Sequence, residues 1–452
     1  MPKDRQQLLV GSLRRLVRRG AKTHLRRVLD KARSEDIAEA LEGFLSAEAR
    51  TVFHMLLEEP ERAAEVASNF DHQRLEQLFQ GLRPEQLKPV FDFLASDDAA
   101  DIMAALSEEM RQGILDVLAD EESEDIEELM QYSADTAGGI MTTDFFALDK
   151  EMTAREAIVA LQENPDAELV FYVYCINEDG TLVGVISLRQ LLLIPPATQL
   201  KVAMSSEVIS VPVTMDQEQV AAIVARYDLL ALPVIDDFNK LVGIATVDDV
   251  LDVLRDEATE DMMLMAGVGD EDIGARSTLR SVRVRLPWLL AAVAGGLGAA
   301  FLIGTFEDQL QKVAILAAFI PIVMGLGGNV GVQASTIVVR GLAMEQLDPH
   351  NFLTALLSEL KVVLFTAGVC ALLVCGAAMV MPGGYWQLAA GVSCSLFAVM
   401  VFGAFLGTSV PMFSHRLGID PAVATGPILT TCIDLFGVLI YFMISMAWLE
   451  KA

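Results

Sequence analysis

The chain has 452 residues, 53% of them hydrophobic, and combines a net charge of −29 with a mean hydropathy of +0.43. This excludes a purely soluble and a purely membrane-embedded protein, so an acidic soluble part must be joined to an apolar part. Residues 1–286 hold 28 basic and 54 acidic side chains, which disfavours nucleic-acid binding and favours either plain solubility or cation binding. The five cysteines show no CxxC spacing and are interpreted as small core residues.

The first 33 residues form a basic segment at the front of this acidic chain. Eleven lysines and arginines occur there with only two acids, Asp4 and Asp30. We expect residues 1–33 to be a helical extension with a solvated charged face, or alternatively a helix on a membrane surface. The apolar stretch Leu8–Val10 is too short for the core of a signal peptide, so the front half is predicted to stay in the cytosol.

A 12-residue period follows in the soluble part. Apolar anchors recur at this spacing, followed by turn or capping residues, at Phe70, Leu82, Leu94, Leu106 and Leu118. The pattern predicts short helices stacked in a small superhelix, which we assign to residues 34–132.

Two copies of one sequence unit come next. The stretch MTTDFFAL at Met141 recurs as MSSEVISV at Met204, and LVGVISLRQLL at Leu182 recurs as LVGIATVDDVL at Leu241. These runs and their spacing predict a βαββα-like unit in each copy, over residues 133–200 and 201–253.

The two copies resemble a tandem pair of cystathionine-beta-synthase (CBS) domains, regulatory modules that often bind adenosine nucleotides. In that family a serine or threonine followed three residues later by aspartate holds the ribose. The second copy has Thr246 and Asp249, whereas the first has Ser187 and Gln190. The resemblance therefore implies a site for ATP or another adenosine nucleotide at Thr246 and Asp249.

An amphipathic helix is predicted to connect the second copy to the apolar half of the chain. The helix begins near residue 247, and we assign residues 254–283 to its remainder and the linker that follows. Apolar residues recur at helical spacing from Val247 to Met262, and aspartates and glutamates occupy the opposite side. Like charges three and four residues apart repel one another, so a divalent cation would stabilise this helix. The alternative is an ordinary solvated acidic face.

Five apolar segments within residues 284–452 are long enough to cross a bilayer, which takes about 20 residues per helix. They are 286–306, 313–339, two segments within 362–414 separated at Pro382, Gly383 and Gly384, and 421–449. All three tryptophans lie at segment ends, where their amphipathic rings favour the membrane interface.

Basic residues predict the orientation of these segments. They precede the first segment or fall in the even-numbered connections, at Arg276, Arg280, Arg283, Arg285, Arg340, Lys361 and Arg416. Because such residues gather on the cytosolic side, the N-terminus is predicted to be cytoplasmic and the C-terminus periplasmic or extracellular.

The second segment contains a glycine-rich stretch, PIVMGLGGNVGVQAST, over Pro321–Thr336. One interpretation is close helix packing through small residues. The other is a helix loosened beside a pore, where freed carbonyls and Asn329 face water, since irregular backbone at that depth is tolerated only when it is buried or lines a cavity.

One carboxylate, Asp434, lies near the middle of the last apolar segment. An unpaired charge at the bilayer centre costs roughly 2.5 to 3.5 kcal/mol on insertion scales, and such residues usually serve ion traffic. Asp434 with Thr430 would supply oxygens that suit a hard cation. The plainer alternative is that Asp434 only pairs with another side chain inside a helix bundle.

The combination of motifs resembles the MgtE family of magnesium channels and transporters. It consists of the CBS pair, the VDDVLDVL...EATED helix, PIVMGLGGNVGVQAST and IDPAVATGPILTTCIDLFG, from about residue 34 to the end. The resemblance implies a multidomain membrane protein that forms a homodimer in the lipid bilayer. Its expected parts are an α-superhelical N domain, α/β tandem CBS domains, a connecting plug helix and a five-helix all-α transmembrane domain lining one central pore.

The resemblance also implies site residues. Asp434 corresponds to the pore carboxylate that binds hydrated magnesium, with Asn329 and Thr430 as further pore ligands. Regulatory cytosolic magnesium is implied at Asp97, Asp101, Asp216, Glu218, Asp228, Asp249, Asp252, Glu257, Glu260, Asp261 and Asp420. One departure is Gly426, where some relatives have asparagine before the proline of the last span.

These observations together predict a magnesium-selective channel or transporter, and not an enzyme. It would take up Mg²⁺ across a bacterial inner membrane and be closed by cytosolic Mg²⁺ bound to the acidic N domain, CBS pair and plug helix. The alternatives are a CBS-regulated transporter of Co²⁺, Mn²⁺ or Ni²⁺ and a membrane-anchored nucleotide sensor without transport. An anion channel would need basic pore residues, and an ATP-driven pump would need a G-x-x-x-x-G-K-[ST] loop that does not occur.

Overall fold

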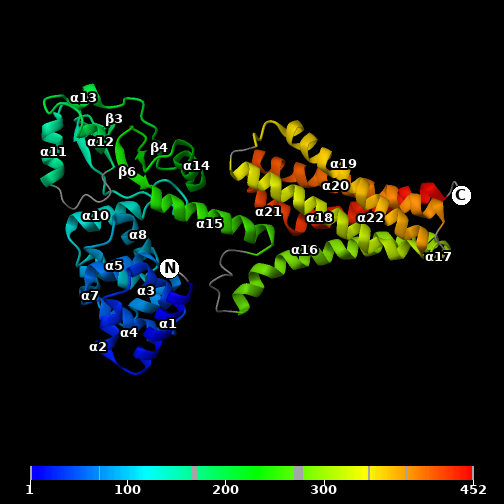
Figure 1. Cartoon of the computed structure of the whole chain (residues 1–452), viewed down its shortest axis with the longest axis horizontal. Coiled ribbons are helices and arrows are strands. Elements are labelled where there is room, and N and C mark those ends of the chain that lie inside the picture. Colours follow the sequence, from blue (N-terminus) through cyan, green and yellow to red (C-terminus); the bar gives the residue numbers. More distant parts are fainter. Residues whose placement is uncertain are drawn as a thin grey trace. The chain divides into compact units, whose positions relative to one another are not determined.

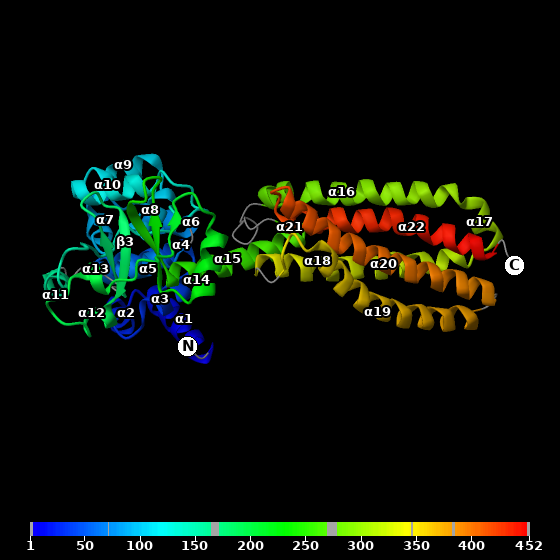
Figure 2. The ribbon, with the colours of Figure 1, turned by 90° about the horizontal axis from the view of Figure 1, so that it is seen from above.

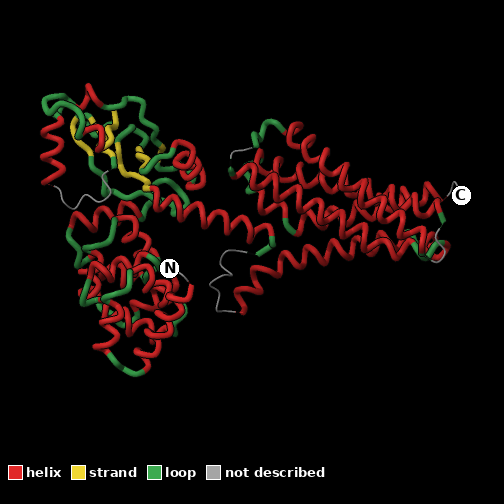
Figure 3. Tube along the Cα trace, viewed as in Figure 1, coloured by secondary structure: helices red, strands yellow, loops and turns green. Residues whose placement is uncertain are grey.

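The computed structural model describes residues 3–70, 72–163, 171–268, 278–344, 347–381 and 385–449. The chain divides into two compact units, Met1–Val253 and Leu254–Ala452. All described strands belong to the first unit, and the described part of the second unit is helical (Figure 3). The basic residue Arg276 and the separating residues Pro382–Gly384 lie outside the described residues.

From Pro60 to Asp120 the short helices at the front of the first unit begin every 12 residues, as predicted, and a 14-residue step separates Pro60 from the helix start at Ser46 (Figure 1). The same spacing occurs before Phe70, the first anchor residue recognised in the sequence, because helices also begin at Lys22, Ser34 and Ser46. The bounds are α1 (Lys3–Arg18), α2 (Lys22–Leu29), α3 (Ser34–Glu42), α4 (Ser46–Leu56), α5 (Pro60–Ser68), α6 (His72–Phe79), α7 (Pro84–Phe91), α8 (Ser96–Ala104), α9 (Glu108–Leu115) and α10 (Asp120–Leu129).

Arginines tie successive layers of this superhelix together. Arg62 donates hydrogen bonds to the carbonyl oxygens of Leu29 and Ala32, at 2.8 and 2.9 Å, just after α2. Arg74, one repeat later, donates in the same way to two carbonyl oxygens at the end of α3. A guanidinium in this place satisfies carbonyls that the helix leaves unpaired and puts positive charge at the negative end of its dipole.

The basic segment shares a core with the superhelix that follows it. Leu13 of α1 and both Leu25 and Leu29 of α2 are buried in the same hydrophobic cluster as the next helices. Arg18 of α1 binds Glu48 of α4 at 2.7 Å. The segment is helical with an exposed charged face, as expected, and its apolar side is packed on the superhelix.

Each copy of the repeated unit has the expected βαββα order. In the first, β1 (Ala147–Asp149) runs parallel to β2 (Tyr172–Ile176), which is antiparallel to β3 (Leu182–Ser187). In the second, β4 (Val211–Pro212), β5 (Ala231–Ile235) and β6 (Leu241–Thr246) repeat this arrangement. The helices are α11 (Ala154–Glu163), α12 (Leu188–Leu191), α13 (Leu200–Ala203), α14 (Gln217–Tyr227) and α15 (Val247–Met265), the last of which continues into the second unit.

The segment that leads into each copy pairs with the last strand of the other copy. Thr142 and Ile244 exchange backbone hydrogen bonds of 2.9 and 3.0 Å, and Val185 and Ser205 do the same. The two copies are therefore interlocked by backbone bonds, and α15 follows directly from a strand held in this way.

The glycine of each repeated LVG motif makes this exchange possible. A Cβ on Gly184 would lie 2.2 Å from the sulfur of Met204, and a Cβ on Gly243 would lie 2.6 Å from that of Met141. Because methionine from one copy lies against the strand of the other, no larger residue fits at either glycine.

Five helices among the described residues are long and apolar enough to cross a membrane, as predicted. They are Ser281–Thr305 within α16 (Thr278–Thr305), α18 (Leu316–Ala343), α19 (Phe352–Val380), α20 (Trp386–Arg416) and Pro421–Leu449, which comprises α21 (Pro421–Thr425) and α22 (Pro427–Leu449). The short helix α17 (Glu307–Lys312) connects the first two. In this unit α18, α20 and α22 run alongside one another (Figure 2). The third span starts earlier than expected, so it includes Glu359 and Lys361.

The glycine-rich stretch of the second span belongs to one unbroken helix, α18. The expectation of a loosened helix is therefore wrong, and the alternative of close packing is confirmed. A Cβ on Gly407 would lie 2.3 Å from the carbonyl oxygen of Gly331, and one on Gly403 would lie 2.6 Å from that of Gly327. Backbone thus lies against backbone where α18 crosses α20, which requires glycine at positions 403 and 407 of α20.

The break in a membrane helix occurs instead in the last span, at Gly426. α21 ends at Thr425 and α22 begins at Pro427, a residue without an amide hydrogen that suits a helix start. A Cβ on Gly426 would lie 2.9 Å from the carbonyl oxygen of Met265, the last residue of α15. Glycine at this position therefore lets the connecting helix end directly against the start of α22.

Candidate functional site

A first carboxylate cluster lies where α8 and α15 begin. The Thr143 amide donates to the Ser96 hydroxyl at 2.9 Å, and the Ser96 amide donates to Asp144 at 3.2 Å, so the start of α8 is bound to the segment before β1. Because the neighbouring Thr142 pairs with β6 and α15 follows β6, both helix starts are held in one part of the unit. The aspartates that interact there are Asp97, Asp98 and Asp101 of α8 and Asp248, Asp249 and Asp252 of α15.

Burial and mutual repulsion raise the pKa of three of these carboxyl groups from 3.8 to about 7. Burial is the largest cause of each rise in pKa, and the charge of a neighbouring aspartate is the second largest. That neighbour is Asp98 for Asp97, Asp249 for Asp98, and Asp97 for Asp249. The Thr246 hydroxyl lies within hydrogen-bonding distance of Asp248 and Asp249. Like charges at close range favour the protonated form of each carboxyl, and a bound cation relieves the same repulsion.

The donor set of this cluster fits a hydrated cation better than a bare one. Within the described residues, no three histidine, cysteine or carboxylate side chains are arranged to hold a metal ion directly. Magnesium keeps several of its waters and is usually bound through one or two carboxylates. The Oδ1 atom of Asp97 is buried without a hydrogen-bond partner among the described residues, which leaves it free to accept from a water of such an ion.

The raised pKa values predict a pH dependence of magnesium binding at this cluster. A raised native pKa contributes stability that is fully present below the ordinary value of 3.8 and is lost as pH rises through about 7. Without magnesium, the melting temperature of the soluble part should therefore fall between pH 6 and pH 8, and millimolar magnesium should raise it more at pH 8 than at pH 6.

Calorimetry of the purified full chain at both pH values, with ionic strength matched by NaCl, measures this difference. The double variant Asp98→Asn/Asp249→Asn should show nearly equal magnesium effects at the two pH values. This control distinguishes titration of the cluster from titration of the five histidines of the chain, which also change charge near neutral pH. A magnesium effect of the same size at pH 6 and pH 8 in the unaltered chain would contradict the expectation.

Three of the predicted regulatory residues lie at opposite ends of α14. Asp216 caps its start by accepting from the Glu218 amide at 3.0 Å, and Asp228 follows its end in a left-handed conformation with φ 51°. A helix of 11 residues is about 16 Å long, so within one chain Asp228 cannot share an ion with Asp216 and Glu218. Their assignment as magnesium ligands stays a prediction.

A second group of charges lies at the other end of α15, in the second unit. The pKa of Asp261 is raised to about 6 by burial and by the charges of Asp420 and Glu257, and Arg340 partly counteracts the rise. The carboxylate of Asp420 also accepts from the Ala422 amide at 2.7 Å, so it caps α21 whether or not it binds an ion. Asp249 and Asp261 are 12 residues apart on the helix, about 18 Å, and therefore belong to separate sites.

The apolar side of α15 is exposed on a single chain. Leu251 and Met262, both on the predicted apolar side, are 60% and 65% exposed, whereas the buried residues of this helix are Val250 and Val253 at its start. The acidic Glu260 is exposed as well, so α15 presents both apolar and acidic residues.

Asp434 lies on the interior side of α22. Successive helical residues are about 100° apart, so Asp434 points away from Phe436 and Met443, which lie about 200° and 180° around the helix. Those two apolar residues are 51% and 61% exposed, as expected for a lipid-facing side, whereas Asp434 is half-buried. Thr430, one turn earlier, lies on the same side as Asp434 and donates its hydroxyl to the Pro427 carbonyl at 3.1 Å.

Two neighbours of Asp434 pack tightly against other helices. The Ile433 side chain lies against Gly331 of α18, and Thr431 lies against Gly295 of α16. Asp434 is thus held between two packed faces of α22. Asn329 is exposed on α18, about 200° from the packed residue Gly327, so one chain does not bring Asn329 and Asp434 together on its packed faces.

A cavity of about 640 Å³ lies at the first copy of the repeated unit, with Leu230 from the second copy in its wall. Its lining combines aromatic, aliphatic, hydroxyl and cationic side chains: Phe171, Tyr172, Ser187, Leu188, Arg189, Leu192, Leu193 and Leu230. The Ser187 hydroxyl accepts from the Gln190 amide at 3.2 Å. The cavity therefore contains the serine of the first-copy motif, whereas the sequence comparison of the copies favoured Thr246 and Asp249.

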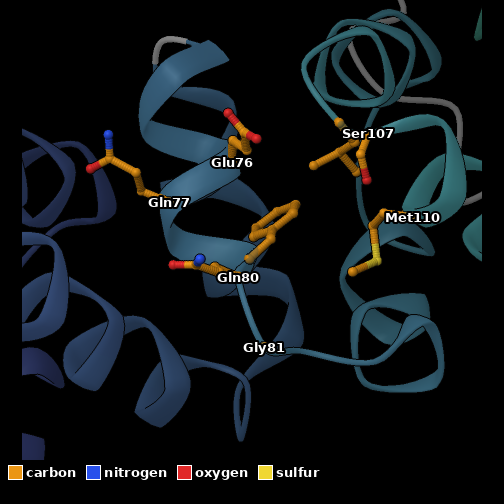
Figure 4. Close-up of a pocket in the computed structure, with 8 residues that line it drawn as sticks. Glu76, Gln77, Gln80, Gly81, Ser107 and Met110 are labelled. Carbon is orange, nitrogen blue, oxygen red and sulfur yellow. The ribbon is translucent and has the colours of Figure 1, made fainter.

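A second cavity, of about 410 Å³, lies between α6 and α9 (Figure 4). Gln77 and Gln80 point toward neighbouring helices, where they bind Ser46 at 2.6 Å and Arg50 at 2.9 Å. What faces the cavity is mostly apolar, with Glu76 and Ser107 as its polar groups. This chemistry does not select a particular ligand.

Models of known families match three parts of the chain. The MgtE intracellular N domain matches residues 32–135, CBS domains match 137–195 and 199–256, and a divalent cation transporter domain, MgtE, matches 320–444. The magnesium transporter MgtE of Thermus thermophilus is 35% identical over 453 residues, covering 98% of this chain and 99% of the relative. The chain belongs to the MgtE family of magnesium transporters.

Other MgtE proteins agree with this assignment. The magnesium transporter MgtE of Bacillus subtilis is 37% identical over 358 residues, 79% of each chain. A crystal structure of the cytosolic domain of the Mg²⁺ channel MgtE in complex with ATP matches with a TM-score of 0.51 and 35% identity, covering 54% of this chain and 99% of that one. The predicted fold class is confirmed: an MgtE N domain, a CBS pair and five apolar helices.

The sequence reasoning missed Asp98 and Asp248 as members of the acidic cluster. Both are adjacent to residues that it selected, Asp97 and Asp249, so the local excess of acid was visible. Neighbouring residues of a helix point in directions about 100° apart, however, and only the packing of α8 beside α15 determines which of them meet.

Proposed function

We propose that this MgtE-family protein carries magnesium across the membrane and that Asp434 binds the hydrated ion on its way. The observation that carries the proposal is the position of Asp434, which is half-buried on the interior side of an otherwise uncharged span. A carboxylate there is costly unless an ion or water meets it. Magnesium gives up its waters reluctantly, so selection would rest on hydrated size and charge, with Thr430 and the amide of Asn329 as further oxygens.

We further propose that two chains form the pore. Within one chain Asn329 is exposed on α18, whereas Asp434 lies on the interior side of α22, so one chain does not bring the two side chains together. A second chain related by a symmetry axis would supply the further oxygen ligands of the pore. In the predicted orientation the soluble unit is cytosolic and magnesium enters toward it.

The proposed regulation is electrostatic. When cytosolic magnesium is high, ions would bind the acidic cluster of α8 and α15 and the carboxylates of Asp261 and Asp420, which favours a closed state. When it is low, repulsion among these carboxylates would disfavour that state and open the pore. The raised pKa values of Asp97, Asp98 and Asp249 support this proposal because, after burial, repulsion between neighbouring carboxylates contributes to each rise.

Flux into proteoliposomes tests the transport proposal and its alternatives. The purified full chain is reconstituted, and uptake of Mg²⁺, Co²⁺, Mn²⁺, Ni²⁺ and Ca²⁺ is measured at equal concentrations. We expect Mg²⁺ uptake with slower uptake of the other ions, because the pore binds the hydrated ion. If Co²⁺, Mn²⁺ or Ni²⁺ is taken up faster than Mg²⁺, that ion is the substrate instead of magnesium. Absence of any flux would favour a membrane-anchored nucleotide sensor without transport.

We also propose that an adenosine nucleotide binds the cavity at the first copy. The relative solved with ATP supports a nucleotide site in the CBS pair. In this chain the cavity offers Tyr172 for stacking against a base, Ser187 for a ribose and Arg189 for phosphate.

Isothermal titration of ATP to the full chain distinguishes the two copies. Arg189→Gln removes a cation from the first-copy cavity, and Thr246→Val removes a hydroxyl at the second copy. We expect Arg189→Gln to weaken ATP binding roughly tenfold or more and Thr246→Val to leave it unchanged, because a charge-assisted bond to phosphate contributes about 1.5 to 3 kcal/mol. The reverse pattern would place the nucleotide at Thr246 and Asp249.

A further inference from the structure

We propose that a basic surface formed by α1, α2 and the short turns that follow them binds anionic lipid headgroups. The surface consists of exposed basic side chains without an ion pair among the described residues: Arg15, Arg19, Lys22, Arg27, Lys31 and Arg33. Other arginines of the same segment are used inside the fold, since Arg18 binds Glu48 and Arg26 binds Glu58. The segment therefore has more positive charge than its packing on the superhelix requires.

The charge of this surface contrasts with the remainder of the chain. Residues 1–33 hold eleven basic and two acidic side chains, which leaves 22 basic and 60 acidic ones for the other residues. The remainder of the first unit is strongly acidic and is repelled by an anionic surface, so this segment is the part of that unit that such a surface attracts. Lysine and arginine near an anionic membrane contribute about 1 kcal/mol each, within a Debye length of about 8 Å.

The membrane is the favoured anionic partner because the same chain carries both this surface and the membrane helices. Val253, the last residue of the first unit, precedes the first membrane helix at Ser281 by 28 residues. Residues 254–265 of this stretch are helical in α15, and so short a covalent connection raises the effective concentration of the bilayer near the first unit. The exposed Leu8 lies two turns before Arg15 on the same side of α1 and is 71% exposed, which suits insertion among headgroups. Nucleic acid would be attracted by the same charges, but it is not connected to the chain and offers no apolar layer for Leu8.

Energy transfer from a donor at the N-terminus to acceptor-labelled lipids tests the proposal on the full chain in nanodiscs. We expect transfer to be at least roughly twofold higher with about 30% phosphatidylglycerol than with phosphatidylcholine alone, and about 0.5 M NaCl should abolish the difference. The triple variant Arg15→Gln/Arg19→Gln/Arg27→Gln should lose the response to anionic lipid.

A matched control removes three other basic side chains of the first unit, in Arg83→Gln/Lys150→Gln/Arg155→Gln. These residues lie outside the basic surface and form no side-chain ion pair among the described residues, so the control should keep the full lipid response. Equal transfer in neutral and anionic nanodiscs would overturn the proposal, and so would an equal loss in both triple variants. Binding of a labelled oligonucleotide without any lipid response would assign the surface to nucleic acid instead.

Discussion

Replacing Asp434 by asparagine is expected to reduce magnesium flux at least about 100-fold while the protein stays folded. The substitution keeps the volume of the side chain and removes its charge from the interior side of α22. Removing an attraction of roughly 3 kcal/mol for the divalent ion lowers occupancy by about two orders of magnitude. Because a half-buried charge is replaced by a neutral group, stability in detergent should stay equal or rise.

The matched control is Glu359→Gln on α19. Glu359 also lies within a membrane-spanning helix, two residues before Lys361, so it controls for loss of a carboxylate in the membrane domain. Flux should stay near that of the unaltered protein. Magnesium flux into liposomes and thermal unfolding are measured for both variants. A well-folded Asp434→Asn protein with normal flux would eliminate the pore-ligand assignment, and a less stable protein with normal flux per folded molecule would assign Asp434 a structural pairing role.

Neutralising the first acidic cluster is expected to abolish control of the soluble unit by magnesium. The variant Asp97→Asn/Asp98→Asn/Asp249→Asn/Asp252→Asn removes both the repulsion and the oxygens that would bind the ion. In the unaltered chain, millimolar magnesium should slow proteolysis of the soluble unit at least roughly tenfold, since a ligand at 100 times its Kd stabilises the bound state by about 2.7 kcal/mol. In the variant, the proteolysis rate should be the same with and without magnesium.

A second quadruple variant controls for the change in net charge. Glu85→Gln/Glu109→Gln/Glu124→Gln/Glu127→Gln removes four exposed carboxylates of the superhelix outside the cluster. It should keep the full magnesium response, measured by the rate of loss of the intact band during limited proteolysis. Undiminished protection in the cluster variant, or equal loss in both variants, would show that magnesium acts on the overall charge and not at α8 and α15.

Local patterns in the chain determined the architecture of this protein. Apolar anchors at a 12-residue spacing predicted the superhelix, because each short helix buries one apolar face on the next. Duplicated strand motifs predicted two βαββα units, and charge-free runs predicted the five membrane helices, because a bilayer requires about 20 apolar residues per helix. The carboxylate at Asp434 was visible for the same reason, since a single charge stands out in an apolar run.

Contacts between distant segments were decided only by the tertiary structure. The pairing of Thr142 with Ile244 brings the start of α8 to α15 and adds Asp98 and Asp248 to the acidic cluster, although about 150 residues separate these helices. The glycine-rich stretch of α18 could equally have been packed or unwound, because glycine favours both. The backbone of α20 lying against Gly327 and Gly331 decides for packing. Helical spacing specifies which residues share a face, whereas the neighbour that covers that face depends on the whole fold.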